Sequence, residues 1–352
     1  MYPYPGNRYI IIFNVSLKVM INILKFFSLV LFFAFNAVSF QISAKDSSFS
    51  QSVTDLILQC HFDSANDLID SYRKSDSKNP LPPVLKLAVL GMRDVDLEMT
   101  VDSLLFMNTY ALAIANVLDY EKNYGKSDYS RMLVGFTKAI HSSFYLRRKM
   151  YMSAMHNGID AMKTLREAKE IDSTNTEVDF FLGLYDYAKA ELRSRMWWIM
   201  FWYPGDKKEG IAKLENCTKT AFIVGNAAQI TLSNIYTDEK KPEKAIRIIQ
   251  HLDSLYPSSR FVGWAKVKYF EKLKMYTNAA EEYNKLSSQY LSVKNGQYNS
   301  FFTKKKEAVM YYEAGQKSKV QVICKAILSD PLLTNEDIRK ETKRLLEKVN
   351  ES

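Results

Sequence analysis

The stretch AQITLSNIYTDEKKPEKAIRIIQHLDSLYP, residues 228–257, decides the fold, because VGWAKVKYFEKLKMYTNAAEEYNKLSSQY, residues 262–290, repeats it at a shift of 34 residues without a gap. Equivalent positions hold residues of similar size: Tyr236 and Phe270, Ala245 and Ala279, Leu252 and Leu286. A large aromatic residue in one helix needs a small residue opposite it, so that two antiparallel helices can approach closely. Polar breaks such as TDEKKP separate the two helices of each pair. The period therefore predicts helix pairs that stack and share a core.

The frame extends beyond these two repeats. Three further segments fit it, and they begin at Phe144, Val178 and Thr303. In the first of them, Ala161 takes the small position. Residues 56–80 look like the end of another helix pair, around Ala65, whereas residues 81–143 are helical by pattern but out of frame.

These residues resemble the tetratricopeptide repeat, whose pattern runs Leu, Gly, aromatic, Ala, aromatic, Ala and Pro. The positions that meet the pattern best are Leu182, Gly183, Leu232, Tyr236, Ala245, Pro257, Phe270, Ala279 and Tyr283. The resemblance covers residues 144–330 and implies an all-α, right-handed solenoid of antiparallel helix pairs. Lys266 and Leu291 depart from the pattern, because an apolar residue and a terminal proline are expected there.

The final segment, residues 331–352, is predicted to be a helix that caps the solenoid. Thr334 is its expected N-cap, and acidic residues follow in the first turn. Three apolar residues recur at near-helical spacing: Ile338, Leu345 and Leu346. A helix with such a polar outer face would cover the open end of a stack of helix pairs.

The composition agrees with a helical protein. The 352 residues include 12 glycines and 9 prolines, which argues against sandwiches, barrels and disorder. The three cysteines, Cys60, Cys217 and Cys324, are far apart and form no C-x-x-C motif. We expect each to pack as a small apolar residue, although one disulfide pair is an open alternative.

The N-terminal segment, residues 1–44, differs from the rest because it is basic, apolar and free of acidic residues. From Met20 it has a lysine, an apolar run at 26–40, and Ile-Ser-Ala ending at Ala44. This order is typical of a secretory signal peptide cleaved after Ala44, with Met20 as the alternative true start. The apolar run is shorter than the roughly 20 residues that span a bilayer. We therefore favour cleavage over the alternative, an uncleaved N-terminal anchor.

Export would place the protein in the periplasm or elsewhere in the cell envelope, and it argues against a nucleic-acid partner. Without residues 1–44, 45 basic side chains face 39 acidic ones. This mild excess fits a solvated surface as well as an anion-binding face. The mature chain would then comprise a helical region at 45–143 with one degenerate repeat, the repeats at 144–330 and the capping helix.

An aromatic segment, RMWWIMFWYPGD at residues 195–206, interrupts the frame. Val178 and Ala228 are 50 residues apart, 16 more than the period, and most of the extra residues fall in an insertion at 191–205. Its aromatic tip consists of Trp197, Trp198, Phe201, Trp202 and Tyr203. Together these side chains would exceed the apolar patch of roughly 300–600 Å² that soluble monomers expose, so something must cover them.

Three interpretations of this tip remain open. It packs inside the protein, against the helices of 81–143; it meets a membrane surface or another protein; or it lines a groove for a small apolar ligand. We expect Trp197 and Trp198 to be core residues, and Trp202 and Tyr203 to reach outward. The sequence PGDKKEGIAKL after the tip also resembles a tetratricopeptide family of outer membranes and exported proteins, some of which are linked to lipid-body clearance.

No motif in the sequence indicates catalysis or a bound cofactor. The four histidines, His61, His141, His156 and His251, are scattered and lack metal-ligand spacing. The sequence contains no G-x-S-x-G, P-loop or G-x-G-x-x-G motif. We therefore expect a protein that is not an enzyme and has neither a metal nor another cofactor.

The first helices of the repeats are predicted to line a groove. The side chains that the frame turns toward it are Tyr187, Asn234, Trp264, Lys268, Lys272 and Lys305. Aromatic and lysine side chains together would suit an extended peptide with acidic and apolar residues. The sequence thus predicts a non-enzymatic scaffold of the cell envelope that binds another protein. The alternative function is binding of a lipid or apolar ligand, or of a membrane surface, through residues 196–203.

Overall fold

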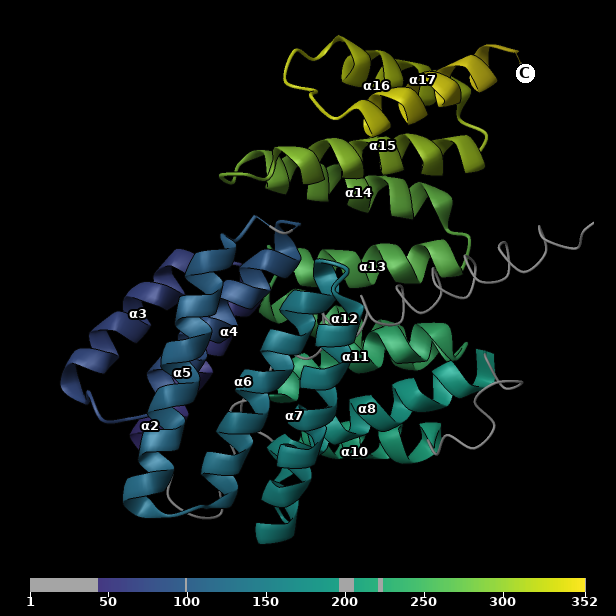
Figure 1. The fold of residues 1–352 in the computed structure, drawn as a ribbon. Helices are drawn as coiled ribbons and strands as arrows, with labels where there is room; N and C mark the ends of the chain where they lie inside the picture. The colour runs from purple at the N-terminus through teal and green to yellow at the C-terminus, as the bar shows by residue number, and fades with distance from the viewer. Residues whose placement is uncertain (1–43, 99, 196–205, 221–223, 352) are drawn as a thin grey trace, which may run out of the picture. The chain divides into compact units, whose positions relative to one another are not determined.

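The structure, a computed structural model, describes residues 44–98, 100–195, 206–220 and 224–351. These residues form α-helices joined by turns, with no strand among them (Figure 1). Helices that follow one another in the chain pack against each other. The predicted all-α class with antiparallel helix pairs is therefore confirmed.

The chain divides into two compact units. Unit 1 contains residues up to 57, 61–95 and 101–229, and unit 2 contains residues 58–60, 96–100 and 230–352. The division at 229/230 falls inside one helix, and the division at 95/96 falls at the last residue of another. The domain limits predicted from the repeat frame stay a prediction.

Unit 1 is built from the helices of the N-terminal part of the chain (Figure 1). They are α2 (Ala44–Leu58), α3 (Phe62–Ser75), α4 (Leu81–Asp96), α5 (Ser103–Tyr124), α6 (Asp128–Arg147), α7 (Tyr151–Ile171), α8 (Thr176–Arg195) and α10 (Lys207–Thr220). Helix α6 packs against both α5 and α7, and nearly all of its residues are buried. A side chain added at Gly210 of α10 would lie 2.5 Å from the carbonyl oxygen of Gly183 in α8. The two backbones can approach this closely because both residues lack a Cβ atom.

Unit 2 is a series of helix pairs followed by a last single helix. After α11 (Val224–Asp238), which crosses the division, the helices are α12 (Pro242–Leu255), α13 (Arg260–Lys272), α14 (Tyr276–Leu291), α15 (Gln297–Glu313), α16 (Lys317–Ser329) and α17 (Glu336–Glu351). From α13 to α17 they stack in chain order around a core of aliphatic and tyrosine side chains (Figure 1). Fully buried Ala279 and Leu286 belong to this core, as the 34-residue shift predicts.

Five of the helix pairs, α2/α3, α6/α7, α11/α12, α13/α14 and α15/α16, are joined by the same turn. One residue in each turn takes a left-handed conformation with φ between 56° and 72°: Cys60, Lys149, Lys240, Lys274 and Gly315. The N–H of the next residue donates to the carbonyl five positions earlier, over 2.8–3.0 Å. This bond is the one that ends helices in a Schellman motif. Lys240 and Lys274 are 34 residues apart, so the sequence period is also the period of the turn.

The side chains around this turn repeat as well. The accepting carbonyl belongs to an aromatic residue in four of the five pairs: Tyr145, Tyr236, Phe270 and Tyr311. Five positions after the left-handed residue stands a buried small residue or a valine: Ala65, Ala154, Ala245, Ala279 and Val320. The aromatic and small positions predicted for residues 228–290 are therefore equivalent in three dimensions.

Two details differ from the sequence predictions. The frame that starts at Phe144 is wrong, because Phe144 lies near the end of α6 and residues 151–171 form one uninterrupted helix. The turn lies at Lys149, so the small residue after it is Ala154 and not Ala161. The N-cap of α17 is Asn335 and not Thr334, because the Asn335 side chain accepts from the N–H of Ile338 at 2.9 Å.

Several predictions fall outside the described residues. The segment 1–43, with most of the expected signal peptide, is one of these parts, and the aromatic tip at 197–203 is another. Among the residues that are described, no helix is long and apolar enough to cross a membrane.

Candidate binding surface

The predicted groove residues occupy the first helices of their pairs, but they differ in exposure. Tyr187, on α8 of unit 1, is 3% exposed, and Asn234, on α11, is 5% exposed. The side-chain amide of Asn234 donates to the Ile230 carbonyl at 3.0 Å. Both side chains therefore present almost no surface to a ligand, and α11 is buried on all sides from 230 to 237.

Helix α13 carries the part of the predicted groove that reaches the surface. Trp264, Lys268 and Lys272 follow one another at intervals of four residues and therefore share one face of the helix. Trp264 and Lys268 are half-buried, whereas Lys272 is exposed. We call these three residues the α13 row.

The two lysines of the α13 row lie in different surroundings. The Lys268 ammonium lies 2.6 Å from a carboxylate oxygen of Asp238, at the end of α11. Burial lowers the pKa of Lys268, the Asp238 carboxylate raises it, and the neighbouring charge of Lys272 lowers it further. Two lysines at this spacing repel each other, which costs a few tenths of a kcal/mol. A ligand carboxylate placed between them would relieve that repulsion.

Hydrogen bonds fix the indole of Trp264. Its Nε1–H donates to the Tyr290 hydroxyl at 2.8 Å, and that hydroxyl donates to a carboxylate oxygen of Asp96 at 3.1 Å. The Trp264 ring also packs edge-on against Tyr283, with ring centroids 5.9 Å apart. The half-exposed face of the indole is therefore held in place before any ligand arrives.

The anchor of this chain of bonds is a buried ion pair. The side chain of Asp96 is 1% exposed and accepts from both Nε and a terminal nitrogen of Arg260, at 3.0 and 2.5 Å. The side chain of Asn299 donates to the Asp96 carbonyl at 2.7 Å. Burial and the Asp96 carboxylate raise the pKa of Tyr290, so its hydroxyl keeps the proton that it donates.

Helix α15 extends the surface beside the α13 row. Phe302 is half-buried, and its ring lies 6.4 Å from that of Trp264. The Lys305 ammonium lies 5.0 Å from the Phe302 centroid and pairs with Glu341 of α17, but Lys305 is only 9% exposed. Lys305 therefore belongs more to the α15–α17 contact than to an open groove.

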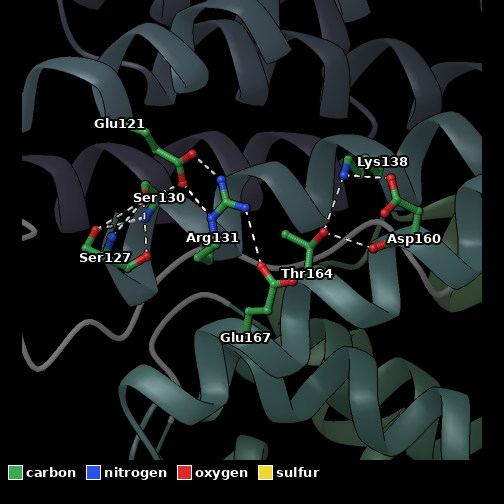
Figure 2. A network of polar contacts seen from close by, with 8 residues as sticks. All are labelled: Glu121, Ser127, Ser130, Arg131, Lys138, Asp160, Thr164 and Glu167. Carbon is green, nitrogen blue, oxygen red and sulfur yellow. Dashed lines mark hydrogen bonds and ion pairs between the residues drawn. The ribbon is translucent and has the colours of Figure 1, made fainter. Parts of the chain in front are cut away.

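A second polar network lies in unit 1 and joins α5, α6 and α7 (Figure 2). Arg131 of α6 donates to both oxygens of Glu121 in α5, with the Nε bond 2.6 Å long, and lies 3.4 Å from Glu167 in α7. The Ser130 hydroxyl donates to Glu121 at 2.8 Å, and Lys138 pairs with Asp160 at 2.7 Å. Each of these charged groups has a partner on a neighbouring helix, so we assign these contacts to the register of the three helices.

The cysteine thiols and the buried histidine are in surroundings that keep them neutral. Burial raises the pKa of Cys60 to about 12 and that of Cys324 to about 11, and it also raises the pKa of Cys217. Burial lowers the pKa of His141 to about 4, against a hydrogen bond to Asn157 that raises it. In the described part of the chain, no group of three or more His, Cys, Asp or Glu side chains is placed to hold a metal ion.

Sequence reasoning missed the residues that hold Trp264 in place. Asp96 is 164 residues away from Arg260, and no period or motif connects them. The one available signal was the pair of acidic residues, Asp94 and Asp96, at the end of the mainly apolar helix α4.

A scan against protein-family models and a search of curated proteins find no match to this chain.

Proposed function

We propose that this protein is a non-enzymatic scaffold with tetratricopeptide-like helix pairs, which binds an extended acidic segment of another protein along the α13 row. The observation that carries the proposal is the row itself: an indole fixed by hydrogen bonds, followed on the same helix face by two lysines. Such a face suits a peptide that offers a flat or apolar side chain to Trp264 and carboxylates to the lysines.

The regularity of the helix pairs supports the proposed repeat family. The turn recurs with the same backbone geometry at Lys240 and Lys274, at the 34-residue period of tetratricopeptide repeats. Helix-pair repeats use the surface of their first helices to bind extended partners. In unit 2 that surface includes the α13 row and Phe302 of α15.

We also propose that the protein is exported, on the basis of the residues between Met20 and Ala44. N-terminal sequencing of protein isolated from the cell envelope should begin near Lys45. Recovery of an intact Met1 or Met20 from a soluble cytosolic fraction would contradict export without affecting the proposed binding function.

Peptide selection tests the binding proposal directly, because random peptides take the place of the natural partner. A library of such peptides is displayed and selected for binding to the full-length protein. The enriched peptides are then tested for binding to the variant Lys268→Glu/Lys272→Glu. We expect the enriched peptides to contain carboxylates next to an aromatic or aliphatic residue. Peptides without acidic residues, or peptides that bind the variant equally well, would refute the proposed site.

A matched variant controls for the change in net charge. Lys317 and Lys325 are exposed on α16, the second helix of its pair, so Lys317→Glu/Lys325→Glu alters the charge equally on another helix. This control should bind the selected peptides as tightly as the unmodified protein. The control should keep its melting temperature, because substitutions at the surface usually change stability by only about 0.5 kcal/mol. Lys268→Glu/Lys272→Glu should keep its helical content but melt at a lower temperature, because it replaces the ion pair of Lys268 and Asp238 with two carboxylates.

A further inference from the structure

Helix α5 in unit 1 has an apolar face that points away from the core. Its opposite face is buried and contains Phe106, Ala113 and Val117. The exposed face consists of Leu104, Leu105, Asn108, Ala111, Leu112, Ala115, Leu118 and Asp119. The four leucines are 40–69% exposed. We call this set the α5 face.

The α5 face has almost no charge. From Ser103 to Leu118, Tyr110 is the only residue with an ionisable side chain. A surface helix usually presents charged residues to water, and an apolar face of this extent marks a contact surface. The face also lacks the lysines and arginines that attract a helix to an anionic membrane.

The order of residues along the face is close to a palindrome. Alanines and Leu112 occupy the middle, at 111–115, and leucines stand near both ends, at 104–105 and at 118. Leu104, Asn108, Ala111, Ala115 and Leu118 also follow the alternating spacing of three and four residues seen in helix–helix seams. A surface that meets a second copy of itself across a two-fold axis must be complementary to itself. This face meets that requirement when the two helices run antiparallel.

We propose that the protein forms a homodimer in which the α5 helices of two copies pack antiparallel, with the two-fold axis near Leu112. The small side chains of Ala111 and Ala115 let the two backbones approach at the crossing. Leu104 and Leu105 of one copy then lie against Leu118 of the other.

Charge complementarity favours the antiparallel direction. With the axis near Leu112, the antiparallel arrangement brings Lys122 of one copy to the level of Asp102, the exposed N-cap of α5, in the other copy. These opposite charges attract at both ends of the contact. In a parallel pair, the two Asp119 carboxylates would instead lie at the same level and repel each other.

The α5 face supplies about half of the area that a stable dimer needs, and helix α7 extends it. Helix α5, with 22 residues, is about 33 Å long, so its face alone supplies on the order of 400 Å² per copy. Stable interfaces bury roughly 800 Å² per partner. Helix α7 adds Met152, Met155 and Ile159, which are 54–74% exposed. Its first half lies near α5, because His141 of α6 contacts both Tyr110 of α5 and Asn157 of α7.

Cysteine crosslinking in the full-length protein tests the position of the axis. The native cysteines are buried, so a single added cysteine should report its own surroundings. We expect Ala111→Cys to form a disulfide-linked dimer under mild oxidation. Leu104→Cys alone should not, but a mixture of Leu104→Cys and Leu118→Cys proteins should crosslink at least tenfold more than either alone. Crosslinking of Leu104→Cys to itself, or no crosslinking at Ala111→Cys, would refute the antiparallel dimer.

Mass measurement provides a second test with a matched control. The full-length protein at micromolar concentration should have the mass of a dimer in light scattering, and Leu112→Glu should reduce it to that of a folded monomer. Val322→Glu introduces the same charge at a 69% exposed position of α16 and should leave the dimer intact. The proposal would be overturned if the unmodified protein were monomeric, whether or not it floats with phosphatidylcholine vesicles. It would also be overturned if the Leu112→Glu variant stayed dimeric.

Discussion

The α5–α6–α7 layer of unit 1 and the α11–α16 pairs of unit 2 pack antiparallel helices with different side chains. In unit 2, aromatic residues such as Tyr236 and Phe270 recur with buried alanines at a fixed interval. In the layer, Arg131 joins two neighbouring helices to α6, and His141 lies among aromatic rings. Both regions nevertheless use the same turn. The turn therefore determines that a helix reverses, whereas the side chains between the helices determine their register.

The largest expected effect comes from the two buried ion pairs, one in each region. Arg260→Met leaves the carboxylate of Asp96 buried without its cation and should lower the free energy of unfolding by about 3–5 kcal/mol. Arg131→Met should cost less, because the Glu121 side chain is 7% exposed and that of Asp96 only 1%, so water reaches the unpaired carboxylate more easily. Denaturant unfolding followed by circular dichroism measures both. An Arg131 variant that is the less stable of the two would reverse this ranking.

Close backbone packing in unit 1 should give the next largest effect. Gly210→Ala places a methyl group 2.5 Å from the Gly183 carbonyl oxygen, so α8 and α10 must move apart at a cost of roughly 1–3 kcal/mol. Gly225→Ala is the matched helical control, because its nearest atom would be 3.9 Å away. Thermal melting should show a loss only for Gly210→Ala. Equal melting temperatures would mean that the contact between α8 and α10 is looser than described.

The buried histidine of the layer predicts a pH dependence. The pKa of His141 falls from about 6.5 to about 4 on folding, so the unfolded chain binds a proton first as the pH decreases. Stability contributed by the neutral ring is complete above pH 6.5 and is lost progressively toward pH 4, by about 1.4 kcal/mol per pH unit. His141→Gln should have a smaller slope between pH 6.5 and 5, measured by denaturant unfolding. Parallel slopes would show that the ring is already exposed to water.

The shared turn should give the smallest effect, with opposite signs at two equivalent positions. Lys274→Gly removes the strain of a lysine in the left-handed conformation and should stabilise unit 2 by about 0.5–1 kcal/mol. Gly315→Lys introduces the same strain at the next turn and should destabilise it by a similar amount. Melting temperatures of the two variants provide the measurement. A shift in the same direction for both would contradict the equivalence of the turns.

The fold could be predicted where an aromatic residue and a small residue both recur at the 34-residue period, as Tyr236 and Ala245 do. The prediction was wrong at Phe144 because the 34-residue frame was extended back to it from Val178. The turn at Lys149 has the sequence KMY, as does the turn at Lys274, but the two lie 125 residues apart and so out of that frame. The prediction therefore assigned the small position to Ala161, whereas Ala154 occupies it in the structure.

The candidate site was predictable only along a single helix. Helical spacing places Trp264, Lys268 and Lys272 on one face, and the structure agrees. The burial of Tyr187 and Asn234 depends on what packs around their helices, which spacing does not reveal. The ion pair of Asp96 and Arg260 joins residues far apart in the chain and leaves no local pattern.

Binding of a selected acidic peptide to the α13 row tests the central claim most directly. Isothermal titration of the full-length protein should show an affinity that weakens with added salt and falls at least tenfold in Lys268→Glu/Lys272→Glu. The control Lys317→Glu/Lys325→Glu should bind as tightly as the unmodified protein. If the folded Lys268→Glu/Lys272→Glu variant binds the peptide unchanged, the α13 row is not the binding site.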